Sequence, residues 1–342
     1  MCLVLIGWRA HPEYRLIVAA NRDEFYTRPT ESMRWWPEVA GLLAGRDLGA
    51  TGKAVGDPPG TWLGLTREAQ GRNRFATVTN VRNPKDERVD ARSRGALLMD
   101  FLRGADDRHP NGAVSSGPQA AASGAVSSGP QAAASGAVSS GPQAAASGAV
   151  SSGLQAANSG EFPGPEKYVL DVAAAPDDYN GYNLVVSDLE SLWWHSNRSA
   201  TPPRELTPGF HGLSNGTFLA SAAPGPAAAL EAPQPIWPKM GDGVLGLRAV
   251  VETDPGNLDR YFEVLADRTQ APDDQLPHTG IPLSLERAVS ARFVAHMLHG
   301  TRASTVLLVR EDGSFDMAER SFGRFGKRTG AATFSGTVEL PD

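Results

Sequence analysis

The chain has 342 residues, of which 41% are hydrophobic and 20% charged, a composition typical of globular proteins with a substantial core. Its formal net charge of -6 argues against a dedicated nucleic-acid-binding protein, since such proteins usually present a basic face. The single cysteine excludes an internal disulfide and fits a reducing compartment. No apolar run reaches the roughly 18 to 20 residues of a membrane span, and no basic segment of a signal peptide precedes the first apolar run, so we expect a cytoplasmic protein.

The N-terminus carries the first chemical signal. Met1 is followed by Cys2, the only cysteine, and by an apolar run. Because the side chain at position 2 is small, we expect an aminopeptidase to remove Met1. Cys2 would then hold a thiol and a free α-amine with a pKa of about 8 on one residue, which pairs a nucleophile with a base. This pattern predicts a self-activated N-terminal nucleophile.

Strand and turn signals dominate the first part of the chain. Residues Cys2–Gly7 and Tyr14–Ala20 form two expected strands joined by a turn at 11–13. Neither strand alternates between apolar and polar residues, so both faces of each are expected to be buried. A further strand is expected at Phe75–Val81, and the spacing of apolar residues predicts a helix over Arg92–Leu102.

A low-complexity repeat interrupts the chain. The unit G-A-V-S-S-G-P-Q-A-A-A-S occurs four times with a period of 12 over residues 112–159, with Leu154 and Asn158 as variants. One valine per unit offers too little apolar surface to offset the entropy of ordering the backbone. We expect a flexible, disordered insertion, and a regular repeat structure is the less favoured alternative. The flanking segments, 1–111 and 160–342, are expected to form one discontinuous domain.

The second segment adds further strands and a helix. A strand pair is expected at Tyr182–Ser187 and Ser191–His195, and an amphipathic helix at 258–265. Thr305–Arg310 and Ser314–Ala318 are expected to form a closing hairpin. Strand clusters separated by helices favour an α+β layered sandwich over a doubly wound βαβ fold.

The register of the first hairpin brings a polar segment to the thiol. If the turn is centred between residues 11 and 12, paired positions sum to about 23, which places Cys2 opposite Asn21 at about 5 Å. The segment Asn21-Arg22-Asp23-Glu24 would then lie beside the N-terminus. Such a segment taken alone is more often a solvated strand end.

An N-terminal nucleophile also needs a group that holds the α-amine, donors for the oxyanion and an anchor for the substrate. Asp23 is the candidate for the first role. Arg22 is a candidate either to favour the thiolate or to anchor a substrate carboxylate. Asn80 and Asn215 are candidate oxyanion donors, and a turn or strand-cap role is the alternative for each.

Several short segments stand in an order that is typical of one family. They are Met1-Cys2, Asn21-Arg22-Asp23-Glu24, Gly45-Arg46-Asp47-Leu48, Gly60-Thr61-Trp62-Leu63-Gly64, Thr79-Asn80-Val81-Arg82-Asn83-Pro84, Tyr182-Asn183-Leu184, His211-Gly212-Leu213-Ser214-Asn215, Glu286-Arg287 with Ser290, and Gly300-Thr301-Arg302-Ala303-Ser304-Thr305. Together they resemble the NRDE family, to which the transport and Golgi organisation protein 2 group belongs. The resemblance spans nearly the whole chain outside 112–159.

That family in turn resembles the cysteine-type N-terminal nucleophile hydrolases, which include bile salt hydrolases and penicillin V acylases. The kinship implies a four-layer αββα sandwich, with Cys2 as nucleophile, Asp23 as the group that orients the amine, and Asn80 and Asn215 as oxyanion donors. Two departures stand out. The arginine that those acylases carry three residues before the aspartate is replaced here by Ala20, and their late arginine has three competing counterparts. These are Arg287, Arg292 and Arg302.

The leading hypothesis is an amidohydrolase that cleaves a C–N amide bond of a small or acylated substrate without cofactor or metal. Arg22, Asn21 and Arg302 are the expected substrate-binding residues. The alternative is a non-catalytic binding or trafficking protein for haem or lipid-like cargo, with which a cleft lined by the tryptophan pairs at 35–36 and 193–194 is compatible. A third possibility is an interaction module that acts through the repeat.

Overall fold

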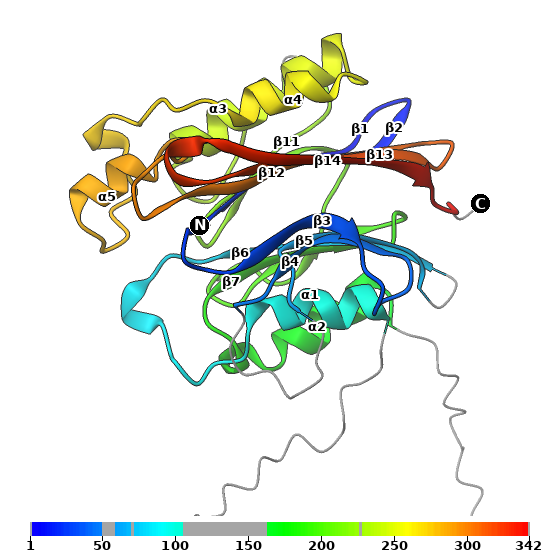
Figure 1. Ribbon diagram of the computed structural model, residues 1–342, viewed down its shortest axis with the longest axis horizontal. Helices are drawn as coiled ribbons and strands as arrows, with labels where there is room; N and C mark the ends of the chain where they lie inside the picture. Colours follow the sequence, from blue (N-terminus) through cyan, green and yellow to red (C-terminus); the bar gives the residue numbers. More distant parts are fainter. Residues whose placement is uncertain (1, 50–58, 70–71, 105–162, 226–227, 341–342) are drawn as a thin grey trace, which may run out of the picture. The chain divides into compact units, whose positions relative to one another are not determined.

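The computed structural model describes residues 2–49, 59–69, 72–104, 163–225 and 228–340. The predicted repeat at 112–159 lies outside these residues, as do the domain boundaries at 111 and 160, which stay predictions. The described residues form a mixed α/β structure built on two seven-stranded antiparallel sheets (Figure 1). Both sheets contain strands from before residue 105 and strands from after residue 162. The parts of the chain on either side of this gap therefore form one unit.

The two sheets take their strands in a spatial order that differs from the chain order. The first sheet contains, in spatial order, β11 (Leu219–Ala222), β10 (Gly209–Leu213), β1 (Cys2–His11), β2 (Tyr14–Phe25), β12 (His299–Arg310), β13 (Ser314–Phe322) and β14 (Arg328–Thr337). The second contains β3 (Thr30–Trp35), β4 (Leu42–Asp47), β5 (Leu63–Ala69), β6 (Arg72–Asn80), β7 (Tyr182–Ser187), β8 (Leu192–Ser196) and β9 (Arg204–Glu205). The expected strands at 2–7, 14–20, 75–81, 182–187 and 191–195 correspond to β1, β2, β6, β7 and β8, and the closing hairpin to β12 and β13.

Helices cover the outer face of each sheet. Helices α3 (Pro238–Thr253) and α4 (Leu258–Leu265) pack on the first sheet, and α1 (Arg94–Arg103) and α2 (Pro165–Ala173) pack on the second (Figure 1). A short helix, α5 (Leu283–Ala288), lies in the long connection between α4 and β12. The helices expected at 92–102 and 258–265 are found as α1 and α4. The layers therefore run helix, sheet, sheet, helix.

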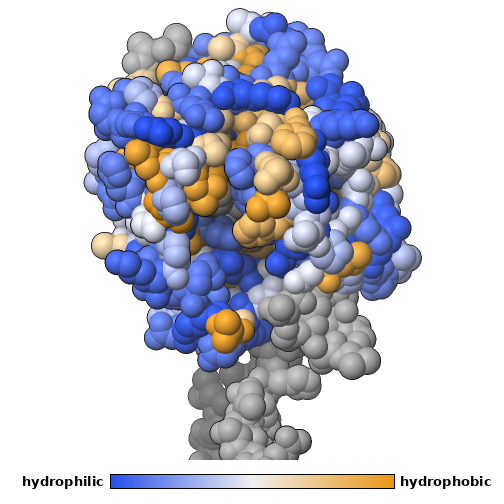
Figure 2. All heavy atoms as spheres, turned by 60° about the vertical axis from the view of Figure 1, so that its left-hand side comes forward, coloured by the Kyte–Doolittle hydropathy of each residue, from blue (hydrophilic) through white to orange (hydrophobic). Residues whose placement is uncertain are grey.

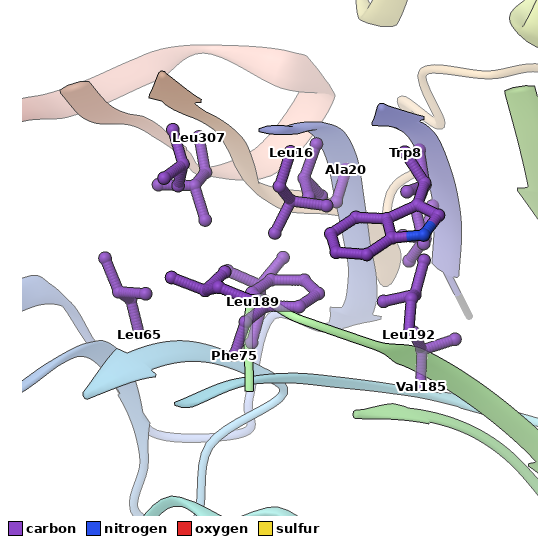
Figure 3. Packing of buried hydrophobic residues seen from close by; sticks show 14 of the residues in the cluster. Trp8, Leu16, Ala20, Leu65, Phe75, Val185, Leu189, Leu192 and Leu307 are labelled. Carbon is purple, nitrogen blue, oxygen red and sulfur yellow. The ribbon is translucent and has the colours of Figure 1, made fainter. Parts of the chain in front are cut away.

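Three apolar layers hold these elements together. Along β1, Val4, Ile6 and Trp8 point into the space between the sheets, whereas Leu3 and Leu5 point toward α3. Figure 3 shows Trp8 packed in the inter-sheet layer with residues of both sheets. A third apolar layer lies between the second sheet and its two helices. Since β1 is buried on both faces, its sequence shows no alternation, as expected.

The predicted register of the first hairpin is off by one residue. Cys2 pairs with Arg22, not with Asn21, and paired positions sum to 24 along most of the strand. The turn lies one residue later than assumed, with His11 opposite Tyr14, and a β-bulge between Trp8 and His11 then changes the sum of paired positions from 25 to 24. A shift of one residue exchanges the two faces of a strand. Arg22 therefore lies on the inter-sheet face with Cys2, while Asn21 points toward the helices.

The inter-sheet layer contains one buried carboxyl group. Glu319 on β13 accepts a hydrogen bond from the Met33 backbone N–H at 2.8 Å and one from Thr305 Oγ1 at 3.4 Å. Burial raises its pKa to about 7, although these hydrogen bonds and the charge of Arg22 act in the opposite direction. Below about pH 7, the folded protein therefore favours the neutral form of the Glu319 carboxyl group.

Replacement of Glu319 by glutamine should therefore change how stability depends on pH. The folded protein holds the carboxyl proton up to about pH 7, whereas the unfolded chain releases it near the ordinary value of 4.5. Folding takes up a proton between these values, so stability falls as the pH rises through this window. We expect Glu319→Gln to be more stable than the wild type at pH 8, by about 2–3 kcal/mol, and similar at pH 4. Urea unfolding at both pH values measures this, and an equal difference at both would contradict it.

Candidate active site

A cleft of about 390 Å³ opens at the end of the molecule where β1 begins. Cys2, Asp23 and Asn80 all line it, together with Arg22 and Trp62. The segment 87–95, which leads into α1, supplies much of the opposite wall. In Figure 1 the chain starts at this side, between the ends of the two sheets, and Figure 2 turns the side forward. Hydrophilic residues predominate there, with apolar patches between them.

The backbone of Cys2 is held by the segment that follows β10. The Cys2 N–H donates to Asn215 Oδ1 at 3.4 Å, and the Cys2 carbonyl accepts from Ser214 Oγ at 2.7 Å. The pairing of β1 with β10 places these residues side by side, because Val4 lies opposite Leu213. Cys2 itself is buried at 8% exposure. The nitrogen of this residue is thus fixed by a side chain that is distant in sequence.

Asn215 connects the two sheets beside Cys2. Its Nδ2 donates to the Asn80 carbonyl at 2.9 Å, and its own carbonyl accepts from the Arg82 backbone N–H at 2.8 Å. In this arrangement the Asn215 amide donor is engaged by the backbone and its oxygen faces the Cys2 nitrogen. Its role as an oxyanion donor stays a prediction. Asn80 itself is one of the residues that line the cleft.

A second cross-link ties the same two segments together. Asn183 donates through Nδ2 to Thr79 Oγ1, to the Ser214 carbonyl and to the Gly216 carbonyl, and Thr79 Oγ1 also donates to Ser214. Both side chains are fully buried. Buried polar groups that are paired in this way fix one arrangement of the chain, since any other would leave them without partners. The segment that holds Cys2 is therefore rigidly attached to the second sheet.

Asp23 lies in a buried, charged environment. Its Oδ1 accepts from Thr301 Oγ1 at 2.7 Å, and only 2% of the residue is exposed. Burial raises the pKa of Asp23 above its ordinary value, while the nearby positive charges of Lys239 and Arg82 and the Thr301 hydrogen bond act in the opposite direction. The aspartate thus lies within electrostatic reach of two buried cations.

Lys239 is a member of the site that the sequence analysis missed. It occupies the first turn of α3, and its Nζ donates to the Val289 carbonyl at 3.1 Å. Burial lowers its pKa to about 8, with Arg82 acting in the same direction and Asp23 and Cys2 in the other. A lysine after Trp-Pro at a helix start looks like a surface residue, so no sequence signal marked it.

Arg22 joins three of the segments that carried the family resemblance. Its guanidinium forms an ion pair with Asp47 at 3.0 Å and lies over the Trp62 ring, 4.5 Å from the ring centre. Glu24 lies 3.6 Å from the same group, and Arg28 pairs with Asp47 at 2.9 Å. The side chain of Arg22 is only 4% exposed. Arg22 is therefore part of the built wall of the cleft beside Cys2.

The other two expected substrate-binding residues lie outside the cleft lining. Asn21 donates to the Leu265 and Arg292 carbonyls and accepts from Ser304 Oγ, which satisfies its side chain on the helix side of β2. Arg302 donates to the carbonyls of Phe25 and Arg28 and to Thr30 Oγ1. Of the competing arginines, Arg287 pairs with Asp273 and Arg292 with Asp267. Each of the three guanidinium groups has at least one partner within the protein, although the Nε atoms of Arg292 and Arg302 are buried without one.

Two findings concern metals and membranes. Within the described segments, no group of three or more His, Cys, Asp or Glu side chains is arranged to hold a metal ion. None of the helices in those segments has the length and apolar character needed to cross a membrane.

The packing of Trp62 under Arg22 depends on Gly45. A Cβ atom at residue 45 would overlap the indole ring, so alanine there must displace the ring. We expect Gly45→Ala to lower the free energy of unfolding by about 1–3 kcal/mol. Gly330→Ala is the matched control, because the nearest atom to its new Cβ would lie 3.9 Å away on Ser321. Denaturant unfolding compares the two, and equal midpoints would show that the ring is not held in this place.

Comparison with known proteins places the chain in a family. It matches the sequence model described as Transport and Golgi organisation 2 over residues 1–117 and 150–324. It is 28% identical to the Transport and Golgi organization 2 homolog of Mus musculus over 338 residues, which cover 94% of this chain and 93% of the mouse protein. The Homo sapiens homolog is also 28% identical, over 341 residues with the same coverage. A shorter match, 32% identical over 112 residues, covers 32% of this chain and 37% of the Drosophila melanogaster protein. The chain therefore belongs to the Transport and Golgi organisation 2 family, as its motifs indicated.

Proposed function

We propose that this protein is a hydrolase of the N-terminal nucleophile type, which cleaves a C–N amide bond with Cys2 after removal of Met1. The observation that carries the proposal is the position of Cys2. The only cysteine lies on the wall of a cleft that it shares with Asp23 and Asn80, and its backbone nitrogen is held by Asn215. The helix–sheet–sheet–helix layers support the proposed kinship with the cysteine-type N-terminal nucleophile hydrolases.

The proposed reaction uses these positions in four steps. Once Met1 is removed, the Cys2 nitrogen is an α-amine, and it takes the proton of the Cys2 thiol. The thiolate attacks the amide carbon, and a C–S bond forms. As the C–N bond breaks, the α-ammonium gives its proton to the leaving nitrogen. Water then attacks the thioester, which releases the acid and restores the thiol.

Neighbouring side chains support these steps in different ways. Asn80 is proposed to stabilise the oxyanion, a contribution typically worth roughly 3 to 4 kcal/mol per donor. Asn215 Oδ1 accepts a hydrogen bond from the α-amine and orients its lone pair toward the thiol. Asp23, buried nearby, balances positive charge in this part of the site. The Arg22 guanidinium, on the same face of the sheet as Cys2, is proposed to attract an anionic part of the substrate.

Carriage of haem or lipid-like cargo is the alternative function. The cleft lining favours the hydrolase, because charged side chains such as Arg28, Asp47 and Arg94 surround it. Of the tryptophan pairs, Trp36 and Trp194 are buried in the apolar layers, and none of the four rings lines the cleft. A haem titration followed by absorbance separates the two functions, since stoichiometric binding without any hydrolysis would favour carriage.

A β-lactone probe, which acylates thiol nucleophiles, tests the proposed nucleophile directly. We expect one acyl group per protein on Cys2 by intact-mass spectrometry, with Met1 absent. Cys2→Ser and Cys2→Ala, both small enough to allow removal of Met1, should abolish the modification at neutral pH. Equal modification of Cys2→Ala would refute the assignment.

A matched variant separates the thiol from the amine. Glutamate inserted between Met1 and Cys2 should block removal of the methionine, so the thiol is retained but its own residue no longer has a free amine. Because a positioned base contributes about 10²- to 10⁴-fold, we expect acylation of this variant to slow by at least 100-fold. Acylation at the wild-type rate would mean that another group activates the thiol.

A further inference from the structure

Four charged side chains are buried together behind Cys2. They come from four elements that are far apart in the sequence. They are Asp23 on β2, Arg82 after β6, Lys239 on α3 and Glu286 on α5. Burial of charge is costly, so such a cluster must be balanced and paired.

Two members of this cluster form a contact pair. Arg82 Nη1 lies 2.9 Å from Glu286 Oε2, and the second oxygen of Glu286 accepts from the backbone N–H and hydroxyl of Thr279. Both side chains are at least nine-tenths buried. Their charges therefore largely cancel. The other two members, Asp23 and Lys239, also carry opposite charges, and each acts on the pKa of the other.

The packing of α3 on β1 places Lys239 beside the N-terminus of the chain. A Cβ atom at Gly243 would lie 2.9 Å from Leu5, so that point of the helix touches the middle of β1. Just past the end of α3, a Cβ atom at Gly256 would lie 3.3 Å from the hydroxyl of Tyr14, which pairs with His11 at the far end of β1. Residue 239, one turn before Gly243 on the same face, therefore lies toward the Cys2 end of β1. At the other end of its side chain, Nζ is held by the Val289 carbonyl. Among the described residues, no carboxylate forms an ion pair with the Lys239 ammonium. Its positive charge is therefore not neutralised by a direct contact and acts on the surroundings of Cys2.

We propose that Lys239 is a positioning residue whose charge offsets Asp23 and thereby keeps the Cys2 α-amine in its neutral, proton-accepting form. This inference rests on the proposed function. Asp23 alone would stabilise the protonated amine, because an opposite charge within about 6 Å favours the charged form. An α-ammonium cannot accept the proton of the thiol. The same lysine charge also favours the thiolate.

The groups that face Lys239 are consistent with this role. Arg82 adds positive charge, Glu286 is paired with it, and Asp23 and Cys2 complete the surroundings. His299 on β12 is also near, and burial, with the charges of Arg82 and Lys239, lowers its pKa to about 3. The histidine is therefore neutral at physiological pH. Lys239, with a pKa of about 8, is mostly protonated at pH 7.

The pH dependence of Cys2 alkylation by iodoacetamide tests this role in the full chain. Lys239→Met keeps the length of the side chain and removes its charge. We expect the midpoint of the alkylation profile to rise by about one pH unit, which is roughly a tenfold slower reaction at pH 7. Lys239→Arg retains the charge and should leave the midpoint close to that of the wild type.

Asp23→Asn supplies a second measurement that does not depend on the folding of the lysine variant. Removal of the negative charge should lower the midpoint. An unchanged midpoint in Lys239→Met, or a rise in Asp23→Asn, would overturn the role of Lys239. Failure of the β-lactone to acylate the wild type would instead refute the hydrolase and leave these alkylation midpoints interpretable.

Discussion

The pairing of β1 with β2 in the middle of the first sheet requires apolar side chains on both faces of each strand, because helices cover one face and the second sheet covers the other. Polar residues are tolerated only where these strands end. Cys2 begins β1, and the polar segment at 21–24 lies near the end of β2. Because the two strands are antiparallel, their pairing brings both to the same end of the sheet, where these strands stop. The cleft lies there, between strand ends of both sheets and the segment 87–95. The candidate site is thus a consequence of where the buried strands stop.

The polar side chains at this end of the sheet are divided between the two faces of β2. On the inter-sheet face, Arg22 rests on Trp62 and pairs with Asp47, which ties the strand to the second sheet. On the helix face, Asn21 and Asp23 hydrogen-bond to β12 and to the connections around it. Neighbouring residues in one short motif therefore have different tasks. One wall of the cleft is built by the arginine, and the buried charge behind the nucleophile is supplied by the aspartate.

Charge balance behind Cys2 gives the site its chemical character. Two carboxylates and two cations are removed from water within one small region. Thr301 and Thr279 donate hydrogen bonds to the carboxylates, and the Val289 carbonyl accepts one from Lys239. In such surroundings a single added or removed charge shifts protonation strongly, because water screens it little. The proposed hydrolase uses this property, since its base is an amine that must stay neutral.

The sequence by itself determined the broad architecture, the positions of seven of the fourteen described strands and the family. Continuous apolar runs marked the doubly buried strands, and the order of the short motifs identified the relatives. The sequence also predicted that Cys2, Arg22 and Asp23 lie at the same end of the first two strands. The tertiary structure alone decided which side chains share a face, because the position of the turn and the β-bulge after Trp8 together set the register that pairs Cys2 with Arg22 and directs Asn21 toward the helices. Only the tertiary structure brought Lys239 to the site, since α3 follows β1 by more than 200 residues and its packing against Leu5 leaves no local pattern in the sequence.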